Sequence, residues 1–103
     1  LGPKHPDVAI THNNLGNAYE KKDLPEKAVE HYEQCLAIET KTLPADHPDL
    51  ADSHYNVGKT YAKRKEKEKA LEHLRKARDI WRKKRGPEDP YVKNAQAMIE
   101  GLK

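Results

Sequence analysis

The chain has 103 residues, and its 20 lysines and arginines outnumber its 17 aspartates and glutamates to give a formal net charge of +3. Charged residues make up 36% of the chain and hydrophobic residues 35%, phenylalanine is absent, and the mean hydropathy is −1.12. This length accommodates one small domain without a large globular core, and no apolar run approaches the roughly 20 residues that span a bilayer. The lone cysteine, Cys35, excludes an internal disulfide and is typical of a reducing compartment, so we expect a cytoplasmic protein.

The chain repeats itself with a period of 42 residues. When residues 43–84 are placed on residues 1–42 without a gap, seventeen positions are identical, and the segment 86–92 falls on the start of the repeat. A fixed period of this size indicates a solenoid, in which each unit buries its apolar face against its neighbours. We therefore predict a single domain with a first repeat at 1–42, a second repeat at 43–84, and a linker with a capping helix at 85–103. Because the chain opens on the first residue of a repeat, we expect it to be a fragment of a longer array.

Each repeat is predicted to form a helix, a turn and a second helix. The first helix of each unit, which we call helix A, is expected at about 6–21, 48–63 and 90–102, because proline opens each segment and apolar residues follow at helical spacing. In the first repeat Pro25 opens helix B, whose apolar face holds Ala28, Tyr32, Cys35, Leu36 and Ile38. The second turn, at 64–67, contains neither glycine nor proline, and its helix B presents Ala70, Leu74, Ala77, Ile80 and Trp81. These patterns predict five helices and no strand.

Small residues recur where the two helices of a pair are expected to approach closely. They are the repeat pairs Gly16/Gly58, Ala28/Ala70 and Cys35/Ala77, and a larger side chain there is expected to force the helices apart. In the last segment, apolar residues are predicted to cover the end of the second helix pair. These residues are Val92, Ile99 and Leu102, with Leu71, Leu74 or Trp81 as their expected neighbours.

The spacing Leu15-Gly16-x-x-Tyr19, followed by Ala28, Tyr32 and Cys35, resembles a tetratricopeptide repeat (TPR). The second repeat follows with Val57-Gly58-x-x-Tyr61, Ala70, Leu74 and Ala77. The 42-residue period, the linkers at 1–9 and 43–51, and the run Asn13-Asn14-Leu15 resemble the kinesin-light-chain subtype. The resemblance implies an all-α fold, a right-handed superhelical α-solenoid of helix-turn-helix repeats, that serves as a scaffold or adaptor for a protein or peptide ligand. His12, His54 and Leu74 depart from the family pattern, which has large apolar or aromatic residues at these positions.

A candidate peptide-binding site lies on the polar side of helix A. In arrays that resemble this one, helix A lines the concave groove, and an asparagine at the Asn14 position holds the backbone of an extended ligand, because an amide both donates and accepts. The predicted peptide-binding residues are Asn13, Asn14, Asn17, Tyr55, Asn56, Lys59 and Lys63, with the two lysines favouring acidic ligand residues. The alternative is that Asn14 and Asn56 bond only the neighbouring repeat. A clamp for a C-terminal carboxylate is not expected, because its basic positions hold Asn13, Asn94 and Met98.

Neither metal binding nor catalysis is predicted. The six histidines form the repeat pairs His5/His47, His12/His54 and His31/His73, so repetition explains them without a zinc site. We expect His12 and His54 to be partly buried and hydrogen-bonded within their helix pairs. Cys35 and Ser53 lack the base and orienting group that a nucleophile needs, and no glycine-rich phosphate loop is present. The prediction is a protein that is not an enzyme and has no cofactor.

Positive charge is concentrated in residues 59–85, which hold thirteen lysines and arginines against four acidic residues. Such a region suits an acidic peptide, a nucleic acid or an anionic membrane surface. We favour a solvated helix surface with neighbouring Glu–Lys pairs, and we predict no membrane or nucleic-acid partner because aromatic residues do not interleave the basic run. Two other functions stay open: a structural spacer or self-association module that joins through its open repeat ends, and polyanion binding by the second repeat.

Overall fold

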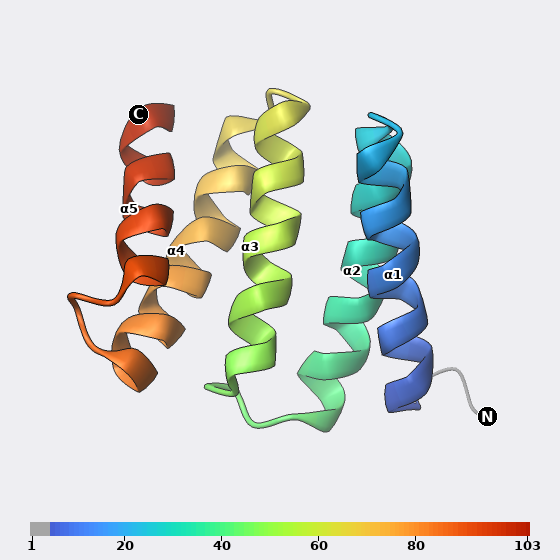
Figure 1. Cartoon of the computed structure of the whole chain (residues 1–103), viewed down its shortest axis with the longest axis horizontal. Coiled ribbons are helices and arrows are strands. Elements are labelled where there is room, and N and C mark those ends of the chain that lie inside the picture. The colour runs from blue at the N-terminus through green and yellow to red at the C-terminus, as the bar shows by residue number, and fades with distance from the viewer. Residues whose placement is uncertain (1–4) are drawn as a thin grey trace.

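The computed structural model describes residues 5–103, which form five helices and no strand (Figure 1). The helices are α1 (Pro6–Lys21), α2 (Pro25–Thr42), α3 (Pro48–Lys63), α4 (Lys67–Arg85) and α5 (Pro90–Leu102). This arrangement confirms the all-α prediction, and α1, α3 and α5 have the predicted bounds of helix A. The first four residues of the linker at 1–9 lie outside the described residues.

The three A helices begin with the same hydrogen bond. The residue before each proline accepts a hydrogen bond from the backbone N–H two positions later, which satisfies a donor that has no partner within the helix. In α1 the acceptor is His5 Nδ1, which lies 3.1 Å from the backbone nitrogen of Asp7. In α3 the acceptor is His47 Nδ1, which lies 3.0 Å from the backbone nitrogen of Asp49. In α5 the acceptor is Asp89, at 2.9 Å. The repeat pair His5/His47 therefore caps helices.

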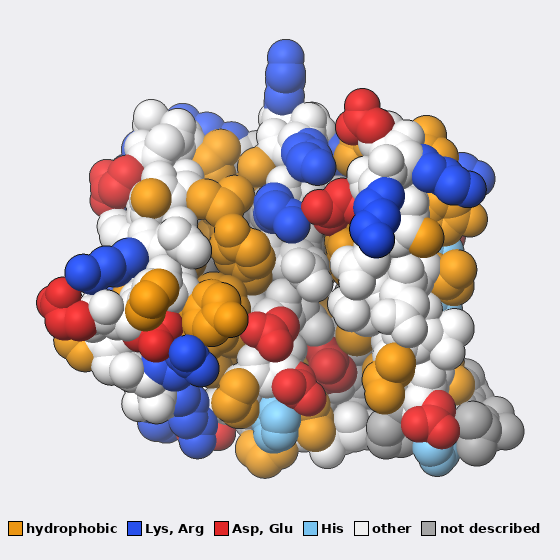
Figure 2. Space-filling view, in the orientation of Figure 1, with side chains coloured by type: hydrophobic (Ala, Val, Ile, Leu, Met, Phe, Trp, Pro, Cys, Tyr) orange, Lys and Arg blue, Asp and Glu red, His pale blue; other side chains and the backbone are white. Residues whose placement is uncertain are grey.

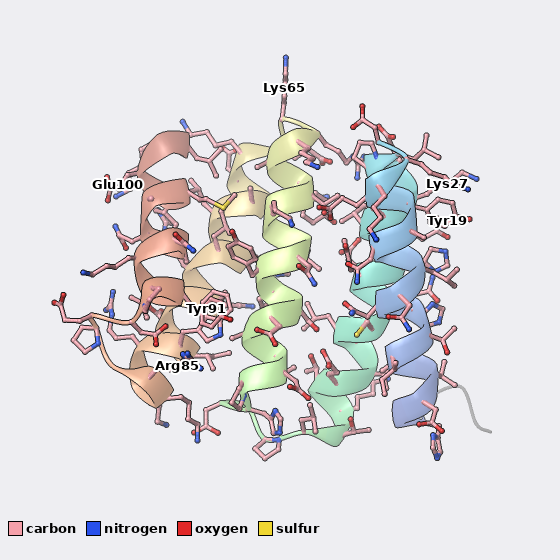
Figure 3. The ribbon with its side chains drawn as sticks, in the orientation of Figure 1. Tyr19, Lys27, Lys65, Arg85, Tyr91 and Glu100 are labelled. Atoms are coloured by element: carbon pink, nitrogen blue, oxygen red, sulfur yellow. The ribbon has the colours of Figure 1, made fainter. Side chains whose placement is uncertain are left out.

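The two turns between helix A and helix B also share one geometry. Asp23 and Lys65, which are equivalent in the two repeats, have positive φ angles of 58° and 63°. A single left-handed residue reverses the chain after the helix, so the turn at 64–67 forms without glycine or proline. The side chain of Lys65 extends from this turn into solvent (Figure 3).

The helices form two layers, with α1, α3 and α5 in the front layer of Figure 1 and α2 and α4 behind them. The closely packed pairs are α1–α2, α2–α3, α3–α4 and α4–α5, so each helix packs against its neighbours in the chain. The front helices are therefore held together mainly through the back layer. This arrangement leaves space between neighbouring front helices for side chains of both layers.

Close approach within each helix pair depends on glycine. A Cβ atom on Gly16 would lie 2.6 Å from Tyr32 Cδ1, and one on Gly58 would lie 2.8 Å from Leu74 Cγ. Both distances are shorter than carbon atoms tolerate. Tyr32 and Leu74 are fully buried, and they occupy the same position in the two repeats. The predicted role of the two glycines is confirmed.

The last helix packs on the second helix pair, as predicted. Ile99 is completely buried in the cluster that contains Leu74, with Leu102 packed against its edge. Val92 is buried in a second cluster with Trp81. The apolar face of α5 therefore covers the side of α4 that faces away from the first repeat.

A histidine pair joins helix A to helix B in both repeats. The Nδ1 atoms are 3.0 Å apart in the pair His12/His31 and 2.9 Å apart in the pair His54/His73. All four side chains are partly buried, which confirms the prediction for His12 and His54. One ring must donate and the other accept, so the contact requires an acceptor nitrogen without a proton. Burial, with the nearby charges of His73 and Lys76, lowers the pKa of His54 to about 4.

We predict that Gly58→Ala destabilises the protein. The new methyl group meets Leu74 and also lies 3.1 Å from the backbone carbonyl oxygen of Ala70, which cannot move aside as a side chain does. Overpacking of this kind costs about 1–3 kcal/mol, and the higher helix propensity of alanine offsets up to about 1 kcal/mol. Urea unfolding followed by circular dichroism measures the net loss. Gly101→Ala is the control, because no atom lies within 4 Å of its added Cβ, and it is expected to cause no loss. Equal stability of the two variants would contradict the packing role.

We also predict that the His54/His73 pair makes stability depend on pH. An unfolded histidine titrates near pH 6.5, whereas the pKa of folded His54 is about 4. As the pH falls through this interval the unfolded state takes up its proton first, so the contribution of His54 is complete above about pH 6.5 and declines towards pH 4. The full pKa shift corresponds to about 3 kcal/mol. Solvent screening of the partly exposed ring reduces the expected loss to the order of 2 kcal/mol.

The measurement is the free energy of unfolding of wild type minus that of His54→Gln across this pH range. The difference isolates the histidine, because raised pKa values of Glu39 and Asp52 change stability in the opposite direction in both proteins. A difference that does not vary with pH would disprove the prediction.

Candidate functional site

A groove with a volume of about 660 Å³ crosses the face formed by α1, α3 and α5. Its walls come from the front helices, and side chains of α2 and α4 reach it from behind. The lining residues are Ile10, Asn13, Asn17, Cys35, Glu39, Asp49, Asp52, Ser53, Tyr55, Asn56, Trp81, Tyr91 and Asn94. Among the described residues, the lining therefore holds four amides, three aromatic rings and three carboxylates, but no lysine, arginine or histidine.

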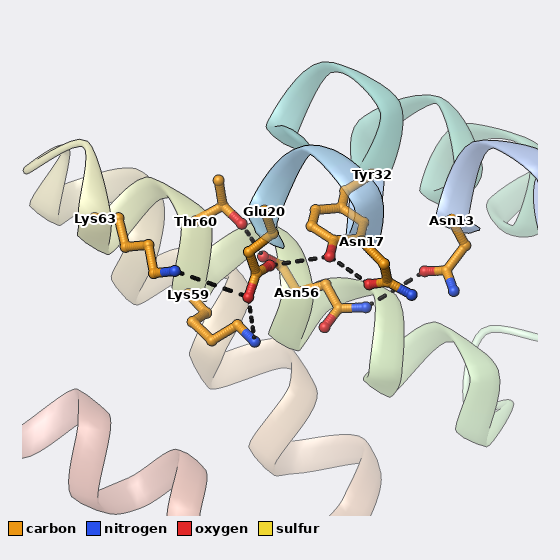
Figure 4. A network of polar contacts seen from close by, with 8 residues as sticks. All are labelled: Asn13, Asn17, Glu20, Tyr32, Asn56, Lys59, Thr60 and Lys63. Atoms are coloured by element: carbon orange, nitrogen blue, oxygen red, sulfur yellow. Dashed lines mark hydrogen bonds and ion pairs between the residues drawn. The ribbon is translucent and has the colours of Figure 1, made fainter. Parts of the chain in front are cut away.

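Of the predicted asparagines, three line the groove and one does not. Asn56 donates from Nδ2 to Oδ1 of Asn13 across the gap between α3 and α1, at 3.4 Å (Figure 4). The Oδ1 atom of Asn17 accepts a hydrogen bond from the hydroxyl of Tyr32 at 2.5 Å. Asn14 is exposed and is not among the lining residues. The repeat-equivalent residues Asn14 and Asn56 thus have different surroundings, because a front helix precedes α3 whereas none of the described residues lies on that side of α1.

The two predicted lysines are paired within the protein. Lys59 Nζ lies 3.0 Å from Glu20 Oε1 and Lys63 Nζ lies 3.8 Å from the same oxygen (Figure 4). Burial alone would raise the pKa of Glu20, but the hydrogen bonds from Lys59 and Tyr32 and the charges of both lysines outweigh burial and lower this pKa. Neither lysine lines the groove. Glu20 therefore occupies the position at which these lysines were predicted to meet an acidic ligand.

Carboxylates gather at the other end of the groove, beside the first half of α3. Ser53 donates a short hydrogen bond to Glu39. Burial raises the pKa of Glu39, and the negative charges of Asp49 and Asp52 raise it further. The pKa of Asp52 is also raised, by partial burial and by Asp49, although Arg85 acts in the opposite direction. The acidic side chains seen over the lower part of α3 in Figure 2 belong to this end of the molecule.

Three aromatic rings form a continuous wall next to these carboxylates. The ring centroids of Tyr55 and Trp81 are 5.5 Å apart, and those of Trp81 and Tyr91 are 5.2 Å apart. Trp81 is 4% exposed and lies deep in the wall, whereas Tyr91 is 48% exposed. Tyr91 extends from α5 towards α3 (Figure 3). We call the residues Glu39, Asp49, Asp52, Tyr55, Trp81 and Tyr91 the acidic–aromatic end of the groove.

Of the residues at this end, the sequence predicted only Tyr55 as part of a binding site. Asp52 and Asp49 precede Asn56 by four and seven residues, so helical spacing places them on the same stripe of α3. The predicted site extended along this stripe only towards Lys59 and Lys63. Glu39 and Trp81 are equivalent positions of α2 and α4, and no helix A pattern could have identified them because they reach the groove from the back layer.

The groove offers little for covalent chemistry. Burial raises the pKa of the Cys35 thiol to about 11, with the Glu39 charge adding to the effect. Its Sγ atom lies 3.8 Å from Ser53 Oγ. Residues 5–103 contain no group of three histidine, cysteine or acidic side chains arranged to hold a metal ion. None of the helices described is long and apolar enough to span a membrane.

We predict that native Cys35 reacts slowly with thiol reagents. The thiol is 3% exposed, and the rise of its pKa from 9 to about 11 reduces the thiolate fraction about a hundredfold. The rate of reaction with 5,5′-dithiobis(2-nitrobenzoic acid) at pH 7.5 is therefore expected to be at least about a hundredfold lower in native protein than in protein unfolded in guanidinium. Comparable rates would show that the thiol is accessible and ionised in the native state.

Comparison with known proteins supports the fold. Two solved structures of the Podosopora anserina "kinesin light chain nearly identical TPR-like repeats", one of them a substituted form, are similar to this chain with a TM-score of 0.89 and 27% sequence identity. The match covers 99% of this chain and 48% of each of those chains, so this chain spans about half their length. No curated protein matches the sequence.

The family profile described as tetratricopeptide repeat matches residues 7–83, which include both helix pairs. Repeats of this family are generally protein-interaction modules, and such domains are typically non-catalytic. The chain belongs to the tetratricopeptide repeat family.

Proposed function

We propose that this protein binds a peptide or protein segment along the groove formed by α1, α3 and α5, and so acts as a scaffold or adaptor module. The observation that carries the proposal is the lining of the groove. Asn13, Asn56 and Asn94 follow one another across three successive front helices and present amide groups. Amides can donate to and accept from an extended backbone, and the neighbouring aromatic rings provide apolar surface for ligand side chains.

We further infer that the bound segment is recognised without covalent chemistry. The family is typically non-catalytic, and the pKa of the Cys35 thiol is raised. Polyanion binding by the second repeat is less well supported. Lys83 and Lys84 both contact Asp46, at 3.2 and 3.4 Å, and Lys59 and Lys63 contact Glu20. Four of the thirteen basic side chains of residues 59–85 thus contact two acidic side chains, in line with a solvated surface.

The repeat supplies a matched pair of variants to test this proposal. Asn56→Ala removes an amide from the groove wall, whereas Asn14→Ala removes the equivalent amide from an exposed position outside it. For peptides selected from a random display library on the wild-type protein, we expect Asn56→Ala to weaken binding by about 1–2 kcal/mol, the cost of leaving a partner unsatisfied. Asn14→Ala is expected to bind as wild type does. Fluorescence anisotropy gives both affinities.

Circular dichroism of the two variants checks that the fold is retained. If Asn56→Ala unfolds, the Asn56–Asn13 contact is structural, and the groove loses its main support as a peptide site. If both variants stay folded and bind as tightly as wild type, the ligand lies elsewhere. A library that yields no binder would favour a spacer or self-association module.

A further inference from the structure

The acidic–aromatic end of the groove differs in charge from the rest of the protein. The chain has a formal net charge of +3, yet the residues that line the groove include three carboxylates and no basic side chain. A ligand in the groove would therefore meet local negative charge. This local charge favours a ligand residue of the opposite charge to the one predicted from Lys59 and Lys63, and both lysines are paired with Glu20.

The carboxylates at this end repel one another. The charges of Asp49 and Asp52 act unfavourably on Glu39, and Asp49 acts unfavourably on Asp52. Arg85 is the basic side chain that opposes this effect at Asp52, but its own Nε is bonded to Asp89 at 2.8 Å. A cation placed among these groups would relieve their mutual repulsion, and in a partly buried site such pairing is screened less than at an open surface.

The aromatic wall is suited to the same type of ligand group. Guanidinium and ammonium groups bind over the faces of tyrosine and tryptophan within about 6 Å of the ring centroid. Within the protein Arg85 makes this contact, because its guanidinium carbon lies 4.7 Å from the ring centroid of Tyr91, and the Tyr91 ring also stacks on Trp81. Tyr91 is also the most exposed ring of the wall. Carboxylates beside aromatic faces match the planar guanidinium of arginine, which forms paired hydrogen bonds and stacks.

We propose that the acidic–aromatic end of the groove binds an arginine or lysine side chain of the peptide segment that occupies the groove, with arginine preferred. This proposal rests on the proposed function, because it assigns one residue of the same peptide ligand. Glu39 and Asp52 supply the negative charge, and the cationic group replaces Arg85 over the exposed ring of Tyr91. The asparagines of the front helices hold the peptide backbone on either side of this residue.

The test uses three acetylated and amidated peptides with the same Gly-Ala-X repeat, in which X is arginine, glutamine or glutamate. Trp81 is the single tryptophan and lies in the groove, so its fluorescence reports binding there directly. We expect the arginine peptide to bind at least about tenfold more tightly than the glutamine peptide, and the glutamate peptide to bind most weakly. Non-specific attraction to a protein of net positive charge would give the opposite order.

Two double variants with the same change in net charge locate the effect. Glu39→Gln with Asp52→Asn neutralises the groove, whereas Glu26→Gln with Glu30→Gln neutralises two exposed residues of α2 that do not line it. The groove variant is expected to lose about tenfold in affinity for the arginine peptide, and the control is expected to stay within twofold of wild type. Equal losses in the two variants would overturn the proposal.

The results also separate this inference from the proposed function. If the glutamine or glutamate peptide binds as tightly as the arginine peptide, as measured by Trp81 fluorescence, the groove binds peptides and the cation preference is wrong. If none of the three peptides binds, the acidic–aromatic end is not a cation site. The proposed function is then also wrong for these peptide sequences. The comparison of the three peptides on wild-type protein does not depend on whether the variants fold.

Discussion

Each helix of this protein packs against the helix before or after it in the chain, and this nearest-neighbour packing determines where the groove lies. The front helices α1, α3 and α5 are held in place mainly by contacts with α2 and α4. The sides that the front helices turn towards one another are therefore not used for core packing. Close approach within a pair depends on Gly16 and Gly58, where no side chain could fit. The groove is therefore a consequence of how the core is formed, because the layer that builds the core leaves the opposite layer open.

Two core features recur in both helix pairs, whereas several groove positions differ. Each pair keeps a glycine against a large buried residue, Tyr32 or Leu74, and a histidine pair between its helices. Ile10 corresponds to Asp52 and Glu39 corresponds to Trp81, so one end of the groove combines acidic and aromatic side chains that no single repeat contains.

Net charge is a poor guide to the local charge of the groove. The basic residues of the second repeat lie mostly on α4 and at the end of α3, and several of them contact acidic residues of the first repeat or of the linker. The carboxylates of the groove are screened by fewer such contacts, and burial raises the pKa of Glu39 in particular. The net charge of the protein and the local charge of the groove thus have opposite signs.

The sequence alone determined the fold class, the family and the boundaries of helix A, because proline at each start of helix A and the 42-residue period are local signals that any solenoid of this type must carry. It also predicted that Asn13, Asn17, Tyr55 and Asn56 lie on the face that lines the groove. Tertiary structure alone decided the charge of that groove. Lys59 and Lys63 point to Glu20 of the neighbouring repeat, and Glu39 and Trp81 reach the groove from the back layer. Such contacts depend on how one repeat is placed against the next. The periodicity of a single helix specifies which residues share a face, but it does not specify that placement.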